Sequence, residues 1–151
     1  RRSRRVAKVI VNARPIESTV ELAKIVASAT SSGRPGMHPA TRTFQALRIA
    51  VNDELAAIEQ VLPQAISSLK SGGRLAVIAY HSLEDRIVKH YFRQESKDCI
   101  CPPEQILCVC GHKAAVKVIT KRPIRPLEEE IAKNPRARSA RLRVVEKITI
   151  E

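Results

Sequence analysis

Aromatic side chains are scarce in this chain of 151 residues, which has two Tyr, two Phe and no Trp. A hydrophobic core must therefore be built from aliphatic residues, and binding of nucleic acid by stacking bases on aromatic platforms is disfavoured. Apolar runs are short, and none approaches the roughly 20 residues that a transmembrane helix needs. Only five glycines are present, and none forms the Gly-x-Gly-x-x-Gly pattern that holds a phosphate at the start of a helix.

Acidic residues are in the minority, because 27 Lys and Arg stand against 15 Asp and Glu and give a net charge of +12. The basic residues are concentrated in two regions, residues 1–50 and 121–143, on either side of a more balanced middle. A charged run is often only a solvated surface, but two such regions favour a polyanionic partner. We expect that partner to be a nucleic acid and not a membrane, since no segment could span a bilayer.

Apolar spacing predicts alternating helices and strands around one core. Helices are expected at residues 2–13, 18–30, 41–62 and 128–132, with Pro63 kinking the third or starting a new turn, and strands at 74–80, 115–120 and 142–150. Residues 31–36 have the Ser, Gly and Pro content of a linker. The strand at 74–80 is almost continuously apolar, which is typical of a buried parallel strand, and Ser82 could cap a helix after it. That helix would bury Ile87, Val88, Tyr91 and Phe92, which completes an α/β unit.

Four segments of the chain occur together in a known order: HPATRTFQALRIAVNDEL at 38–55, GGRLAVI at 72–78, HSLEDRIVK at 81–89 and NPRARS at 134–139. With them the chain resembles the ribosomal small-subunit methyltransferase H family over essentially its whole length. Members of that family are bacterial cytoplasmic enzymes. They transfer a methyl group from S-adenosyl-L-methionine to the exocyclic N4 of a cytidine in the decoding region of 16S ribosomal RNA.

The resemblance implies an α/β fold, the C-terminal half of a Rossmann-like class I methyltransferase sheet plus the end of a helical insertion domain. Residues 1–37 would end the RNA-gripping insertion, residues 38–95 and 113–151 would form the C-terminal part of the Rossmann-like domain, and residues 96–112 a Cys-rich loop. The family's donor-binding elements lie in its N-terminal half, and nothing here matches them. Since the sequence also starts without Met, we expect a fragment that is inactive alone and holds no cofactor-binding residue.

The end of the strand at 74–80 holds the candidate catalytic residues His81 and Ser82. Ligands bind beyond the carboxyl ends of strands in open parallel sheets, so either side chain could line the pocket for the target cytosine. The alternative is that Ser82 only caps the helix and that His81 packs at the strand end. Asp85 with Arg86 is interpreted as a charge arrangement within one helix, with a contact to the substrate as the alternative.

Polar and basic residues at helical or strand spacing are the candidates for RNA binding. On the helix from residue 41 they are Arg42, Gln45, Arg48 and Asn52, and near the C-terminus they are Arg136, Arg138 and Arg141. A solvated surface is the alternative for each group. The partner would be 16S ribosomal RNA or the small ribosomal subunit.

Four cysteines in twelve residues, Cys99, Cys101, Cys108 and Cys110, form a C-x-C-x6-C-x-C pattern. They could bind structural zinc, although C-x2-C is the usual spacing, or remain reduced thiols in the cytoplasm. For the whole chain, the alternative to part of an rRNA methyltransferase is a non-catalytic basic RNA-binding module associated with the ribosome.

Overall fold

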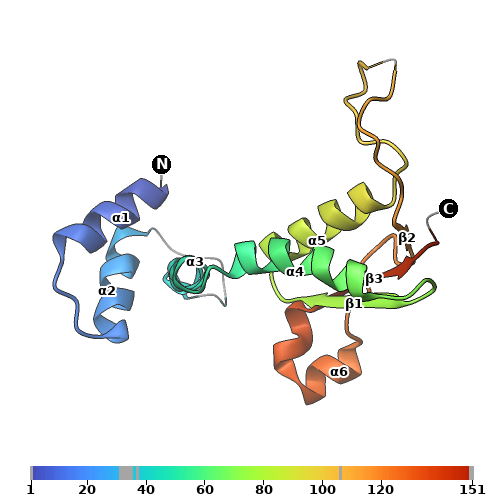
Figure 1. Cartoon of the computed structure of the whole chain (residues 1–151). Helices are drawn as coiled ribbons and strands as arrows, with labels where there is room; N and C mark the ends of the chain where they lie inside the picture. Colours follow the sequence, from blue (N-terminus) through green and yellow to red (C-terminus); the bar gives the residue numbers. More distant parts are fainter. Residues whose placement is uncertain (1, 31–35, 37, 106, 150–151) are drawn as a thin grey trace. The chain divides into compact units, whose positions relative to one another are not determined.

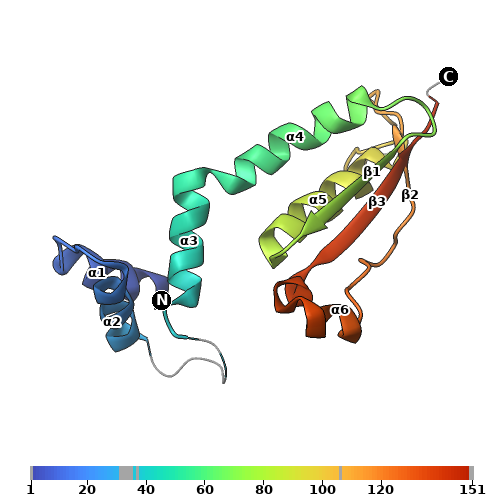
Figure 2. The same cartoon turned by 90° about the horizontal axis from the view of Figure 1, so that it is seen from below.

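The computed structural model describes residues 2–30, 36, 38–105 and 107–149 (Figures 1 and 2). The chain folds as two compact units, residues 1–54 and residues 55–151, each of which is described by itself. The first unit is helical, and the second combines helices with a small sheet. The mixed α/β class expected from the sequence is therefore confirmed.

The first unit begins with helices α1 (Arg2–Asn12) and α2 (Thr19–Ala29), which lie side by side (Figure 2). Ser18 caps α2, because its hydroxyl accepts a hydrogen bond from the Glu21 amide at 3.1 Å. The Glu21 carboxylate reaches back to the Glu17 amide at 3.0 Å, one residue before the position expected for a capping box. Both predicted helices are confirmed, whereas residues 31–35 of the predicted linker lie outside the described residues.

The single helix predicted from residue 41 to 62 is wrong, because the chain breaks it at Asp53. Helix α3 (Thr41–Asn52) ends there, and α4 (Glu54–Ser68) starts at the next residue. Asp53 has left-handed φ and ψ angles of 50° and 39°, a conformation that Asp adopts more readily than most residues. Pro63 does not start a new helix, since α4 continues through it.

The second unit contains a sheet of three antiparallel strands in the order β1 (Arg74–Ala79), β3 (Arg141–Lys147), β2 (Val116–Val118). Arg74 pairs with Glu146 in the register, and their side chains form an ion pair at 2.8 Å. The expectation of a buried parallel strand at β1 is wrong for the described residues. There β1 pairs only with β3, and its residues alternate between exposed and covered, with Ile78 56% exposed.

Helices α4 and α5 (Ser82–Glu95) cover the same side of this sheet, while α6 (Glu128–Lys133) and the 3-10 helix η1 (Pro135–Ser139) lie on the other side near the start of β3 (Figure 1). The buried core joins two helices and two strands, through Leu62 and Ile66 from α4, Val88 and Phe92 from α5, Val116 from β2 and Val145 from β3. The apolar stripe predicted on α5 is confirmed, with Ile87 and Tyr91 packed against this core.

Lys147 at the end of β3 holds the turn between α4 and β1. Its Nζ atom donates to the carbonyl oxygens of Ser67 and Leu69 at 3.0 and 2.6 Å, which satisfies carbonyls left free at the end of a helix. Its backbone carbonyl accepts from the Gly72 amide at 2.8 Å. A Cβ atom at Gly73 would lie 2.8 Å from the Lys70 carbonyl oxygen, so this turn requires a glycine.

Candidate functional site

The junction between β1 and α5 positions the predicted catalytic residues through a capping box centred on His81. The His81 Nδ1 atom accepts from the Glu84 amide at 3.3 Å, and the Glu84 carboxylate accepts from the backbone amides of His81 and Tyr80 at 3.1 and 2.8 Å. His81 Nε2 lies 3.1 Å from the other Glu84 carboxylate oxygen. Since Nδ1 accepts, the neutral ring carries its proton on Nε2. The imidazole is thus held in one orientation at the carboxyl end of β1.

The N-cap of α5 is His81. The sequence had suggested Ser82 for this position. Ser82 is the first helical residue and is exposed. Both positions are followed three residues later by an acid, Glu84 after His81 and Asp85 after Ser82, so the sequence offers two capping registers. The chain adopts the first register because Asp85 is engaged elsewhere. Ser82 and Tyr80 are both exposed at this junction.

Asp85 binds two arginines of β3, and not Arg86 as predicted. Arg143 donates from Nε at 2.6 Å and from Nη2 at 3.3 Å, and Arg141 donates from Nη1 at 3.0 Å. Burial raises the pKa of Asp85, but the hydrogen bonds and charges of Arg143 and Arg141 outweigh it, so the pKa lies below its usual value. Asp85 and Arg143 are both buried, which makes the pair a fixed link between the start of α5 and the sheet.

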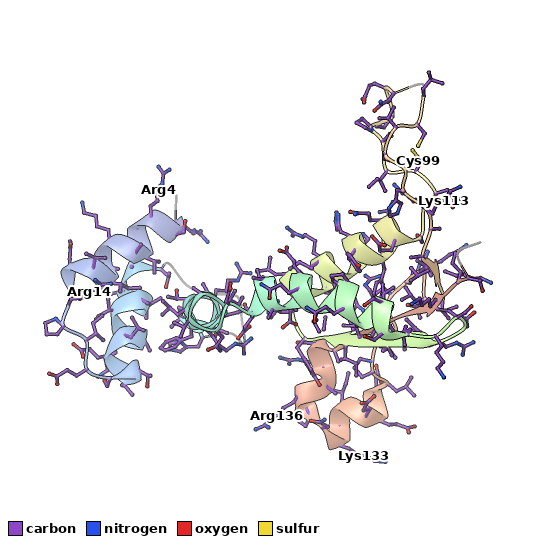
Figure 3. All side chains as sticks on the ribbon, viewed as in Figure 1. Arg4, Arg14, Cys99, Lys113, Lys133 and Arg136 are labelled. Carbon is purple, nitrogen blue, oxygen red and sulfur yellow. The ribbon has the colours of Figure 1, made fainter. Side chains whose placement is uncertain are left out.

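This link also changes the surroundings of Arg141, which the sequence assigned to RNA. Its side chain is one-third exposed and its Nη1 is directed at Asp85. Arg136 and Arg138, on η1, are exposed. Figure 3 shows Arg136 extending from the surface of the unit near Lys133. Asn134 caps this short helix, because its side-chain oxygen accepts a hydrogen bond from the Arg136 amide at 3.3 Å.

The polar strip predicted on α3 ends in a local network in the first unit. Arg48 donates to both carboxylate oxygens of Glu54, at 2.7 and 3.2 Å, and Asn52 donates to the same carboxylate at 3.3 Å. These contacts fasten the last turn of α3 across the break at Asp53. Arg42 is exposed near the start of the helix and Gln45 is half-buried.

The four cysteines lie on a loop between α5 and β2 that extends away from the sheet (Figure 1). Their Sγ atoms all lie within 4.8 Å of one another, so the cluster could hold a metal ion. Hydrogen bonds from the backbone amides of Ile100 and His112 lower the pKa of Cys110 to about 6. The amide of Cys101 acts in the same direction on Cys99, but contacts with the other thiols raise its pKa to about 12.

The described glycines do not form a cradle for a nucleotide-like cofactor. Gly72 and Gly73 precede β1 and are engaged in the turn that Lys147 holds. Gly36 and Gly111 have positive φ angles in other loops.

None of the described helices is both long enough and apolar enough to cross a membrane. At the junction the sequence missed Glu84 and Arg143, and it gave Asp85 the wrong partner. A Glu three residues after His81 is the signal for the first of these. Nothing local in the sequence joins Asp85 to Arg143, because their contact depends on the packing of α5 against β3.

Several known proteins are similar to this chain in sequence. The chain is 56% identical over 146 residues to ribosomal RNA small subunit methyltransferase H of Dehalococcoides mccartyi, 55% over 146 residues to that of Thermomicrobium roseum, and 52% over 151 residues to that of Heliobacterium mobile. These matches take in 97%, 95% and 97% of the chain but 42%, 45% and 48% of the relatives. The chain therefore spans less than half the length of these curated relatives.

A family model describes the same relationship without reference to one relative. The model of the MraW methylase family matches residues 1–148, which includes α1 and α2, the β1–α5 junction and the three-stranded sheet. Because this match extends through both units, the chain belongs to the MraW methylase family.

Proposed function

We propose that this chain forms the substrate side of an enzyme that transfers a methyl group from S-adenosyl-L-methionine to N4 of a cytidine in the decoding region of 16S ribosomal RNA. The observation that carries the proposal is the match to a methylase family over residues 1–148, with relatives named as small-subunit rRNA methyltransferases. Residues 38–95 and 113–151 would then belong to a Rossmann-like domain, and residues 1–37 to a helical insertion. The enzyme would act in the bacterial cytoplasm on the small subunit or its RNA.

The chemistry of the reaction explains what the β1–α5 junction would contribute. The lone pair of a cytosine amino group must be aimed at the donor methyl group, so placement and polar contacts matter more than a strong base. Ser82 presents an exposed hydroxyl that can contact the base. The acceptor nitrogen of His81 is already hydrogen-bonded to the Glu84 amide. His81 would therefore act as a positioning residue that fixes the start of α5.

Binding of RNA would depend mainly on phosphate contacts from basic side chains. Arg136 and Arg138 are exposed on one short helix, and α1 begins with Arg2, Arg4 and Arg5, which are exposed as well. Arg42 on α3 is a further exposed basic residue of the first unit. Arg48 and Asn52 contact Glu54, and Arg141 contacts Asp85. These contacts favour a role for the three side chains in stabilising the fold next to the RNA.

The donor would be bound mainly by protein outside this chain, since the sequence has no Gly-x-Gly-x-x-Gly pattern. The need for a bound methyl donor separates the proposed enzyme from its alternative, a non-catalytic basic RNA-binding module. The alternative is favoured by the net charge of +12, which alone is sufficient for attraction to RNA.

A chimera distinguishes the two functions. The aligned region of the Dehalococcoides mccartyi relative is replaced by this chain, and the product is incubated with methyl-tritiated S-adenosyl-L-methionine and unmethylated small ribosomal subunits. We expect label in the RNA, a large loss with Ser82→Ala, and partial retention with His81→Asn, because Asn is also a good N-cap. A chimera that folds and binds the donor in calorimetry but transfers no label would favour the binding module.

A further inference from the structure

We propose that Cys99, Cys101, Cys108 and Cys110 bind one zinc ion that orders the loop between α5 and β2. Zinc bound by four thiolates is tetrahedral with Zn–S distances of about 2.3 Å, which places the sulfur atoms about 3.8 Å apart. The Sγ atoms of Cys108 and Cys110 lie 3.6 Å apart, and those of Cys110 and Cys99 lie 3.8 Å apart. All four lie within 4.8 Å of one another, so only small side-chain shifts are needed to bind the ion.

Backbone amides support the sulfur atoms in this arrangement. The Cys101 amide donates to Cys99 Sγ at 3.4 Å, and the Ile100 amide donates to Cys110 Sγ at 3.5 Å. Such contacts from outside the ligand set orient the ligands of metal sites and offset their negative charge. The first contact joins the two ends of one C-x-C pair, and the second joins the two pairs.

The folding of the loop explains how C-x-C spacing can serve a tetrahedral site. The Ala115 amide donates to the Glu95 carbonyl at 2.8 Å, and the Ala114 amide donates to Asp98 Oδ1 at 3.3 Å. The loop is therefore closed at its base, on the end of α5, and its two sides run back against each other. Each side contributes one C-x-C pair, so the tetrahedron is assembled across the loop and does not depend on a C-x2-C turn.

The loop needs such a site because it has no core of its own. None of the described residues from 96 to 115 is buried or belongs to a helix or strand. Its apolar residues face solvent, with Leu107 76% and Val109 74% exposed. A metal ion can replace a hydrophobic core in a small segment, because its binding free energy becomes folding free energy. Figure 3 shows Lys113 at the base of this loop, where a cation suits a site with net negative charge.

Metal analysis of the full 151-residue chain tests this inference. Protein purified without chelator, under reducing conditions, should contain about one zinc per chain, as a closed four-cysteine site requires. Cobalt should replace the zinc and give the visible absorption of a tetrahedral thiolate complex. Cys108→Ser should abolish both signals, whereas Val109→Ser, a neighbouring exposed residue that is not a ligand, should leave both unchanged.

Hydrogen exchange provides a readout that is separate from metal content. Removing zinc from the wild-type chain should speed exchange of the amides between residues 98 and 112, while α5 and β3 keep their protection. A wild-type chain with no more zinc than Cys108→Ser and no cobalt spectrum would overturn the inference. A mass showing disulfides in freshly prepared reduced protein would overturn it as well. Neither result would affect the proposed methyl transfer, which is measured on RNA.

Discussion

The contact of Asp85 with Arg143 leads to a prediction about the stability of the second unit. Replacing Asp85 by Asn keeps the size of the side chain but removes the charge that compensates a buried guanidinium. Removing one partner of a buried ion pair costs about 3 to 5 kcal/mol. The Arg143 side chain is 9% exposed and the Arg141 side chain 33%, so part of the charge can be solvated and we expect the lower end, about 3 kcal/mol.

Tyrosine fluorescence follows this unit selectively, because both tyrosines of the chain, Tyr80 and Tyr91, lie within residues 55–151. Urea unfolding of Asp85→Asn should show a free energy of unfolding lower by about 3 kcal/mol, and the melting temperature of this unit should fall by roughly 12 to 24 °C. Glu59→Gln is the matched control, since it removes a carboxylate from an exposed position on α4 and should change stability by less than about 0.5 kcal/mol.

The pH dependence gives a second test of the same contact. The pKa of Asp85 is lowered in the folded chain, so its stabilising effect is fully present above the unfolded value and is lost as pH falls through the folded value. The difference between wild type and Asp85→Asn should be constant from pH 7 to 5 and should narrow below about pH 4. A cost under 1 kcal/mol at pH 7, or a difference that grows in acid, would refute the reasoning.

Further expected outcomes concern the cap, the RNA and the donor. Glu84→Ala should lower the stability of the second unit by about 1 kcal/mol, because both backbone amides at the start of α5 lose their acceptor, and urea unfolding measures the loss. Binding of 16S ribosomal RNA should weaken as the salt concentration rises. In a filter-binding series, Arg136→Gln and Arg138→Gln should each reduce the slope of log K against log salt by about 0.7 to 0.9. An unchanged slope would argue against phosphate contacts. Calorimetry of the 151-residue chain should detect negligible binding of S-adenosyl-L-methionine, and micromolar binding would contradict a donor site outside the chain.

Much of the fold could be predicted from the sequence because local signals agree with the final packing. The apolar stripe of α5 and the position of α2 depend on spacing within a few residues, and both were correctly assigned. The break at Asp53 was missed, because apolar spacing continues across it and a single left-handed residue leaves no periodic signal. The strand β1 was expected to be buried on both faces, since its composition does not reveal which neighbours cover it.

The candidate site was predictable in its place but not in its contacts. Order along the chain identified the strand end at His81 and Ser82. Two capping registers fit the same five residues, and the choice between them depends on Asp85 meeting Arg143, which is 58 positions away in the chain. The same long-range contact involves Arg141, whose spacing with the neighbouring arginines had suggested RNA contact or a solvated surface.

The central claim is that this chain is the substrate side of a cytosine-N4 methyltransferase, and the identity of the methylated nucleoside tests it most directly. Small subunits treated with the chimera described above can be digested to nucleosides and analysed by mass spectrometry, with the 16S fragment that spans the decoding region isolated first. The account predicts N4-methylcytidine in that fragment, and its absence after treatment with the Ser82→Ala chimera. Methylation at another atom of the base, or in another part of the RNA, would contradict it.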